Sequence, residues 1–235
     1  MRSFVAVARA DYKACMGAVF KETQLKRVYF VRHGSTEAIE MDAFQLFETP
    51  LSARGLEQAK FVAKRFKNIP VERIISSTMV RALETAHEIG TITGCTVTES
   101  SFFQEILRPS AIQGRRKDDP EVGAIYDAVI ANFANPEKRH SDEENFFDIK
   151  TRAQEALQFL EAQPERAMVV VTHGVFLRML IATMLHGEAV SPEASARLDS
   201  FLHTDSTGIT ECILTEERGW RLWTWNDSAH LGEVH

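Results

Sequence analysis

The stretch VYFVRHG, residues 28–34, places an arginine and a histidine directly after a short apolar run. The run has the β-branched and aromatic composition that is typical of a buried strand. Arg32 supplies a permanently charged, planar guanidinium that matches phosphate oxygens, and the imidazole of His33 can act as a nucleophile near neutral pH. Gly34 allows a sharp turn and the close approach of a ligand. The stretch therefore predicts a strand that ends in an anion-binding turn.

The composition is that of an ordinary globular chain with a slight acidic excess. Its 235 residues suffice for one large domain with a buried core, and the 44% hydrophobic content excludes a disordered chain. The net charge of −6 gives no electrostatic reason to bind nucleic acid or an anionic membrane surface, so we expect neither partner. The longest apolar stretch, residues 169–185, is too short and too polar for a transmembrane helix. Three scattered cysteines suit a reducing compartment, and we expect a cytoplasmic protein: Cys15, Cys95 and Cys212.

Strand-like and helix-like segments alternate along the chain. Four segments have the composition of strands: 28–31, 73–77, the surroundings of Val97, and 167–172. Four others have helical periodicity: 52–66, with the apolar stripe Leu56, Ala59, Val62 and Phe66, then 79–90, 146–160 and 175–186. Near the end, 208–215 and 220–225 predict a hairpin. We therefore predict an α/β three-layer sandwich, with a mostly parallel central sheet, helices on both faces and a C-terminal antiparallel hairpin.

Side chains with useful chemistry follow the predicted parallel strands. Arg32 and His33 follow the first strand, and Arg81 lies just inside the helix after the second. Glu105 comes shortly after the third strand, and His173 follows the last. Because the carboxyl ends of parallel strands meet at one edge of an open α/β sheet, we expect these five side chains to share one crevice.

This set of side chains is suited to phosphoryl transfer. Two guanidinium groups and a second imidazole can neutralise a phosphoryl group and its transition state. A neutral His33 can attack phosphorus, and the neighbouring positive charge favours that neutral form. An alkoxide leaving group needs a proton, which Glu105 can donate before it activates water in a second step. Glu37 and Glu99 are the alternatives for this role.

The chain resembles the histidine phosphatase superfamily, also called the phosphoglycerate-mutase-like family, from Arg27 to Leu231. The resemblance is carried by VRHGSTE (31–37), PLSARGLEQA (50–59), Ser76-Ser77 with Arg81-Ala82 and Thr85-Ala86, THG (172–174) and WNDSAHL (225–231). It implies that His33 is the nucleophile and Glu105 the proton donor. It further implies phosphate binding by Arg32, Arg81 and His173, and substrate contacts at Thr36 and Gly174. It implies no metal and no cofactor.

Two positions depart from the pattern of the family. Ile39 stands where many members have an asparagine, five residues after the glycine of the first motif, and Val175 replaces a second glycine after the second histidine. The surroundings of the first motif do not resemble the mutase branch, and the insertion after Glu105 is short. We therefore expect a phosphomonoester hydrolase that acts through a phosphohistidine on a small phosphorylated metabolite. The alternatives are a cofactor-dependent phosphoglycerate mutase and a non-catalytic module that binds phosphorylated ligands.

The remaining segments divide the chain into parts. Residues 27–235 form the expected catalytic domain, with a cap insertion near 102–140, where periodicity is weak. Residues 1–26 form an N-terminal extension, which we interpret as a short helix outside the domain rather than a targeting segment.

The terminal hairpin offers an edge through which a homodimer could form. The basic residues Arg108, Arg115, Arg116 and Lys117 fit a solvated loop better than a substrate-attracting cap. Four phenylalanines could wall a pocket, although packing is their commoner role: Phe44, Phe47, Phe102 and Phe103.

Overall fold

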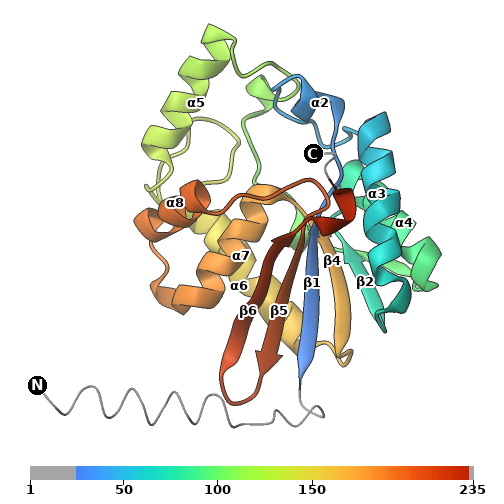
Figure 1. Ribbon diagram of the computed structural model, residues 1–235. Coiled ribbons are helices and arrows are strands. Elements are labelled where there is room, and N and C mark those ends of the chain that lie inside the picture. The colour runs from blue at the N-terminus through green and yellow to red at the C-terminus, as the bar shows by residue number, and fades with distance from the viewer. Residues whose placement is uncertain (1–24, 233–235) are drawn as a thin grey trace, which may run out of the picture.

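The computed structural model describes residues 25–232, which form a six-stranded sheet with helices on both faces (Figure 1). The strands are β1 (Lys26–Arg32), β2 (Arg73–Ser76), β3 (Val97–Glu99), β4 (Ala167–Thr172), β5 (Ile209–Thr215) and β6 (Gly219–Asp227). The α-helices are α2 (Glu37–Glu40), α3 (Ala53–Arg65), α4 (Val80–Thr93), α5 (Pro120–Asn132), α6 (Phe146–Ala162), α7 (Gly174–His186) and α8 (Pro192–Phe201). The predicted three-layer α/β architecture is confirmed. The helix expected within residues 1–26 falls almost entirely outside the described residues.

The order of the strands gathers the functional segments at one edge of the sheet. The order is β3-β2-β4-β1-β5-β6, with β1 to β4 parallel to one another and the hairpin β5–β6 antiparallel. Arg32 pairs with Thr172 across β1 and β4, and Ser76 pairs with Val171 across β2 and β4. The carboxyl ends of these three strands therefore lie next to one another, and the residues that follow them share one site.

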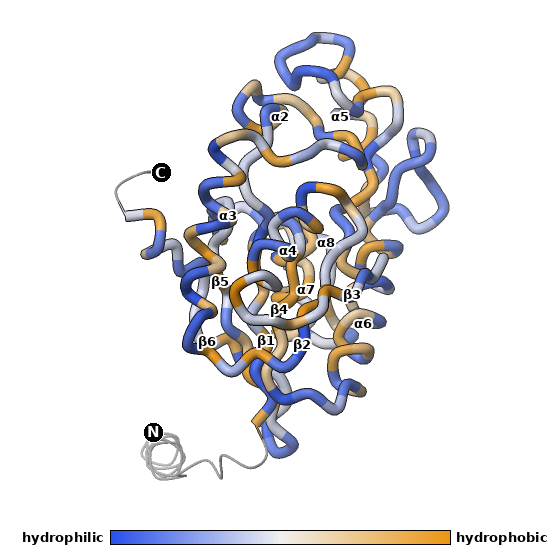
Figure 2. The backbone as a smooth tube through the Cα atoms, turned by 90° about the vertical axis from the view of Figure 1, so that its right-hand side faces the viewer, coloured by the Kyte–Doolittle hydropathy of each residue, from blue (hydrophilic) through white to orange (hydrophobic). Residues whose placement is uncertain are grey.

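Alternation along the strands divides the apolar residues between two layers. Val28 and Phe30 of β1 pack with α6 and α7, whereas Val31 packs with α3 and α4. The same alternation assigns Val170 of β4 to the first layer and Val169 to the second. Figure 2 shows the hydrophobic residues concentrated on the central strands and their flanking helices. Among the helices of residues 25–232, none has both the length and the apolar character that crossing a membrane requires.

Helix α3 begins as predicted, but its buried stripe differs from the prediction. Ser52 caps the helix by accepting a hydrogen bond from Gly55 N at 3.1 Å. Leu56 was expected to be buried and is 39% exposed, so this part of the prediction is wrong. Gly55 is buried instead, because its backbone lies directly against the backbone of Ser35. This contact sets the rotation of the helix and turns the next residue, Leu56, toward solvent.

The contact at Gly55 predicts a large loss of stability on adding one methyl group. A Cβ at Gly55 would lie 1.9 Å from the carbonyl oxygen of Ser35, so the backbone must shift. We expect Gly55→Ala to lower the free energy of unfolding by about 3 kcal/mol, as overpacked sites do. Gly123 in α5 is the matched control, since a Cβ there meets nothing within 4 Å. Gly123→Ala should stabilise the protein by about 0.5–1 kcal/mol through helix propensity. Urea denaturation measures both, and equal effects would contradict the interpretation.

The insertion at residues 102–140 lies beside α2, beyond the carboxyl ends of the strands (Figure 1). It contains α5, which the weak periodicity did not predict. Backbone hydrogen bonds join it to the loop after α2: Phe44 N donates to Arg115 O at 2.9 Å, and Lys117 N donates to Asp42 O at 2.9 Å. The insertion and this loop therefore form one continuous wall.

Candidate active site

His33 follows β1 and is 1% exposed. Its Nδ1 lies 2.7 Å from the carbonyl oxygen of Gly34, which can only accept, so Nδ1 carries the proton. The lone pair of the neutral ring is therefore on Nε2. Nε2 accepts a hydrogen bond from Nε of Arg81 at 3.3 Å. The backbone of Gly34 thus selects the tautomer in which Nε2 can attack an electrophile.

Two arginines lie beside this imidazole, one buried (Arg81) and one partly buried (Arg32). Arg81, at the start of α4, is 2% exposed and also donates to the carbonyl oxygen of Leu46 at 2.9 Å. Burial is the main reason that the pKa of Arg81 is lowered to about 10, which leaves it charged at neutral pH. Arg32 donates to the carbonyl oxygen of Thr204 at 2.6 Å, and burial lowers its pKa as well. Its Nε is buried and has no hydrogen-bond partner within residues 25–232.

His173 follows β4 and faces His33, with 5.0 Å between the ring centroids. Its Nε2 lies 2.8 Å from Oγ of Ser77, and its buried Nδ1 has no hydrogen-bond partner among the described residues. Buried polar atoms without a partner are costly and are rare in folded proteins. Together with Nε of Arg32, this nitrogen is available to a ligand anion.

The surroundings hold both imidazoles in the neutral form. Burial lowers the pKa of His33 well below 6.5, and the charges of Arg81 and Arg32 lower it further. Burial and the same arginines also hold the pKa of His173 well below its ordinary value. A neutral His33 keeps its lone pair, as a nucleophile requires.

These lowered pKa values predict a loss of stability in mild acid. Below pH 6.5 the unfolded chain protonates both histidines, whereas the folded protein keeps them neutral. The unfolded state then binds more protons, so the free energy of unfolding falls as the pH falls, by up to about 1.4 kcal/mol per pH unit for each histidine. Urea denaturation at pH 7, 6 and 5 measures the slope. His173→Asn should reduce it, whereas His203→Asn at an exposed site should not; equal slopes in all three proteins would contradict the prediction.

Glu105 reaches the site from the loop after β3. One carboxylate oxygen accepts hydrogen bonds from the backbone N–H groups of Ile106 (3.0 Å) and Phe176 (2.9 Å), and the other accepts from Val175 N (3.1 Å). The carboxylate therefore lies at the N-terminus of α7 and interacts electrostatically with the guanidinium groups of Arg32 and Arg81.

Two contacts hold the loop of Glu105 against the sheet. Thr172 Oγ1 donates to the carbonyl oxygen of Phe103 at 2.8 Å. The guanidinium of Arg152 donates to the carbonyl oxygens of Phe102 and Gln104 at 3.1 and 2.7 Å. The alternatives for the proton donor, Glu37 and Glu99, are exposed, and in the part of the chain that the structure describes neither lines a pocket at this site.

The two predicted substrate contacts have different surroundings. Thr36 is fully buried; it caps α2 by accepting from Ile39 N at 3.2 Å, and it donates to Oε1 of Gln45 at 3.0 Å. Of these residues, Ile39 and Gln45 line the cavity. Gly174 opens α7, where an added Cβ would lie 3.5 Å from Nε of Arg32.

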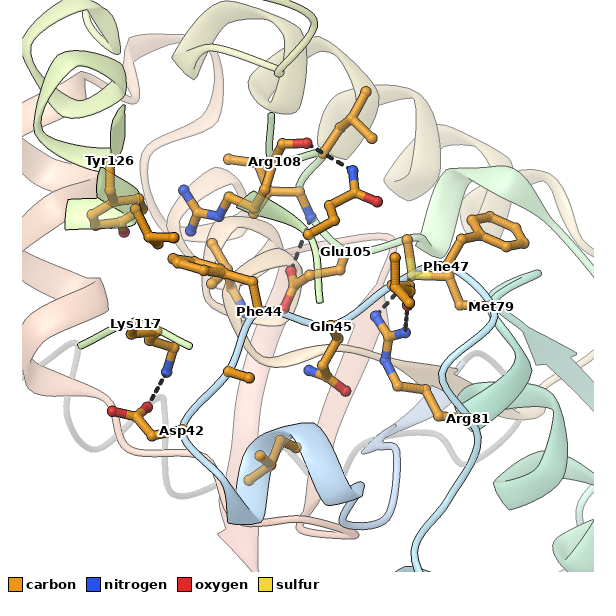
Figure 3. A pocket seen from close by; sticks show the side chains of 18 of the residues that line it. Asp42, Phe44, Gln45, Phe47, Met79, Arg81, Glu105, Arg108, Lys117 and Tyr126 are labelled. Carbon is orange, nitrogen blue, oxygen red and sulfur yellow. Dashed lines mark hydrogen bonds and ion pairs between the residues drawn. The ribbon is translucent and has the colours of Figure 1, made fainter. Parts of the chain in front are cut away.

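A cavity of about 570 Å³ extends from these groups toward the cap. Figure 3 shows Arg81 on one side of it, Phe44, Tyr126 and Lys117 on the other, and Glu105 and Gln45 between them. Four of the five predicted site residues are thus brought to the sheet edge by β1, α4 and β4, and Glu105 by the cap loop. Within residues 25–232 no three His, Cys, Asp or Glu side chains gather as metal ligands would.

Sequence reasoning missed Arg178 and Gln45. Arg178 lines the cavity beside Arg32 and is held by Asp199 at 2.6 Å and by Thr204 Oγ1 at 3.0 Å. The available signal was its position four residues after Gly174, on the same face of α7. Gln45 lies in a loop without periodicity, so no sequence pattern indicated it.

The chain matches known proteins over most of its length. Residues 28–228 match the pattern of the family described as "Histidine phosphatase superfamily (branch 1)". A probable phosphoglycerate mutase of Salmonella arizonae is 30% identical over 212 residues, which are 87% of this chain and 94% of the relative. A similar protein of Proteus mirabilis is 29% identical over 88% of this chain and 96% of its own length.

Solved structures share the fold. A mycobacterial glucosyl-3-phosphoglycerate phosphatase superposes with a TM-score of 0.71 at 24% identity, over 86% of this chain and 100% of the other. A putative α-ribazole-5'-P phosphatase from Escherichia coli gives a TM-score of 0.73 at 23% identity, over 86% and 96% of the two chains. At these identities the likeness concerns the fold.

Proposed function

The chain belongs to the histidine phosphatase superfamily, and from this premise we propose that it hydrolyses phosphomonoesters of small metabolites through a phosphohistidine intermediate. The observation that carries the proposal is the state of His33. Its Nδ1 is bonded to Gly34 O, and its Nε2 lone pair faces a buried guanidinium. A nucleophile with this tautomer, beside two arginines and a second imidazole, is equipped to attack a phosphoryl group.

In the first step Nε2 of His33 attacks phosphorus, and the bond from phosphorus to the ester oxygen breaks. Arg81 turns its Nε–H from Nε2 to a phosphate oxygen, and Arg32 and His173 offer their unpartnered nitrogens to the same group. The carboxyl group of Glu105 gives a proton to the leaving alkoxide. The products are a free alcohol and phosphohistidine.

In the second step Glu105 acts in the opposite direction. Its carboxylate takes a proton from a water molecule as the water oxygen attacks phosphorus. The nitrogen–phosphorus bond breaks, inorganic phosphate leaves, and His33 regains its lone pair. The hydrogen bonds from Val175 N and Phe176 N stabilise the carboxylate that this step needs.

Phosphoglycerate mutase activity is the second candidate, because the named relatives are probable phosphoglycerate mutases. Both activities begin with the same attack. They differ in the acceptor of the phosphoryl group, which is water in a phosphatase and a second substrate hydroxyl in a mutase. The branched side chains of Ile39 and Val175 in the cavity offer no hydrogen bonds to such a hydroxyl, which supports hydrolysis.

One set of assays decides between the candidates. A panel of phosphomonoesters without added metal should yield inorganic phosphate, and rapid quenching with a ³²P-labelled substrate should trap an acid-labile phosphoprotein. With 3-phosphoglycerate and its bisphosphate, isomer formation without free phosphate would support the mutase instead. Background turnover throughout, with measurable ligand binding, would support a non-catalytic binding module.

A further inference from the structure

The cavity next to the phosphate-binding groups has room for a large leaving group. Its volume of about 570 Å³ lies in the middle of the range for small-molecule sites, roughly 300–1,000 Å³. A three-carbon acid would occupy a small part of that space. The chemistry of the walls therefore indicates what else the substrate carries.

Apolar side chains line much of this space. They come from α2, the loop after it, the cap and α7: Ile39, Phe44, Leu46, Phe47, Leu107, Val122 and Val175. Leu46, Phe47 and Leu107 are 46%, 40% and 43% exposed, so they present apolar surface at the opening rather than fill the core. Exposed apolar surface gathered at a concave site is typical of ligand binding.

The charges on the walls balance once the catalytic groups are set aside. Lys117 pairs with Asp42 at 2.6 Å, and Arg178 pairs with Asp199 at 2.6 Å. Arg108 stacks over Tyr126 at 5.2 Å, and the carboxylate of the next residue, Asp127, lines the same space. Apart from Arg32, Arg81 and Glu105, the described lining thus holds three cations and three carboxylates. A second anionic group on the substrate finds no excess of positive charge there.

The side chain and backbone of Phe44, which lines the cavity, are fixed by several contacts. Its ring lies 5.5 Å from that of Tyr126, and Nζ of Lys117 lies 5.9 Å from its centroid. Its backbone donates to Arg115 O at 2.9 Å and accepts from Gly114 N at 2.8 Å. An aromatic surface fixed in this way binds an apolar ring without first losing its own freedom.

From the size, the apolar walls and the balanced charge, we propose that the substrate is a phosphomonoester of an uncharged alcohol with an apolar, ring-sized body. The body lies against Phe44 and Leu107 while the phosphoryl group lies beside His33. This inference rests on the proposed phosphomonoesterase activity. It also distinguishes the substrate from phosphorylated acids such as phosphoglycerate.

Three probes test the proposal: benzyl phosphate, glycerol 3-phosphate and 3-phosphoglycerate. All are esters of primary alcohols, so differences in kcat/KM report mainly recognition of the leaving group. We expect benzyl phosphate to exceed the other two by about 10-fold or more, as burial of a phenyl ring allows. A kcat/KM for 3-phosphoglycerate or glycerol 3-phosphate that equals or exceeds that for benzyl phosphate would overturn the proposal.

Single substitutions test whether Phe44 and Leu107 cause the preference for benzyl phosphate. Phe44→Ala should lower kcat/KM for benzyl phosphate about 10-fold and leave glycerol 3-phosphate within about twofold. Phe61→Ala is the matched control, because Phe61 is 43% exposed on α3 and lies outside the cavity. Leu107→Ala repeats the test at an exposed position, where folding is not at risk. Equal losses on both probes for Phe44→Ala and Leu107→Ala would contradict the assignment.

Calorimetric titration tests the preference of the cavity separately from the proposed phosphomonoesterase activity. If no probe is hydrolysed, the proposed activity fails, yet the order of binding of the three probes to the unaltered protein still tests the cavity. Tightest binding of benzyl phosphate would support the inference alone. Hydrolysis of all three probes with tightest binding of 3-phosphoglycerate would support the activity and overturn the inference.

Discussion

Replacing His33 with alanine is expected to lower kcat for phosphate release by at least about 10⁴-fold, since the loss of a catalytic nucleophile can cost about 10⁶-fold. The reason is that the proposed covalent bond to phosphorus forms at Nε2 of His33, whose lone pair is fixed by the hydrogen bond from Nδ1 to Gly34 O. In the same proposal His173 keeps Nε2 on Ser77 and binds the phosphoryl group through Nδ1. The ³²P-labelled phosphoprotein should disappear together with turnover. Phosphate release at saturating substrate and rapid-quench trapping measure the two effects.

The control for this experiment is His186→Ala, which removes an exposed imidazole at the C-terminal end of α7, outside the pockets at the site. It should keep full activity and full phosphoprotein. Circular dichroism verifies that His33→Ala is folded, and His33→Gln provides a second variant of similar volume. Retention of a tenth of the activity, or of the phosphoprotein, in either variant would exclude His33 as the nucleophile.

Replacing Glu105 with glutamine is expected to have an effect that depends on the leaving group. An alkoxide needs a proton as it departs, so hydrolysis of an alkyl phosphate should fall by about 10²–10³-fold. The 4-nitrophenolate ion leaves without a proton, so 4-nitrophenyl phosphate should lose much less in the phosphorylation step. Single-turnover measurements with both substrates isolate that step from hydrolysis of the phosphohistidine.

The ratio of the two losses identifies the role of Glu105. Because its carboxylate also bonds three backbone N–H groups, a purely structural disturbance would lower both rates by the same factor. Glu99→Gln, at an exposed carboxylate on β3, is the matched control and should change neither rate. Equal losses for Glu105→Gln would assign the proton donor to another group.

Most of the sheet could be predicted from the sequence because its signals are local. The three valines of β4 and the glycine after His173 mark a buried strand and its end, and β4 occupies the predicted residues 167–172. Arg32, His33 and His173 could be placed together because each ends or directly follows a parallel strand, and the topology of such sheets brings these ends to one edge. Nothing in that argument depends on long-range packing.

The parts that were missed depend on contacts distant in sequence. Which face of α3 is buried depends on the contact between the backbones of Gly55 and Ser35. The spacing of apolar residues along the helix gives no sign of this contact. Helices α5 and α8 were not predicted, because polar and apolar residues are not separated onto clear faces. Each nevertheless begins with a capping side chain followed by proline, at Asp119 and Ser191. The cavity walls combine the loop after α2, the cap and α7, which lie far apart in the sequence, so their shape arises only when the chain folds.

The continuous wall built from the loop after α2 and the cap has a consequence for how this protein can change over time. In the proposed mechanism, the groups that act on phosphorus come mainly from the ends of β1 and β4 and from α4, whereas much of the surface assigned to the leaving group lies on the two hydrogen-bonded segments. On this proposal, substitutions in those segments would change which substrate is accepted and leave the groups assigned to the reaction unaltered. Glu105 is the exception, because it lies among the first residues of the cap and the proposed mechanism assigns it to the reaction itself.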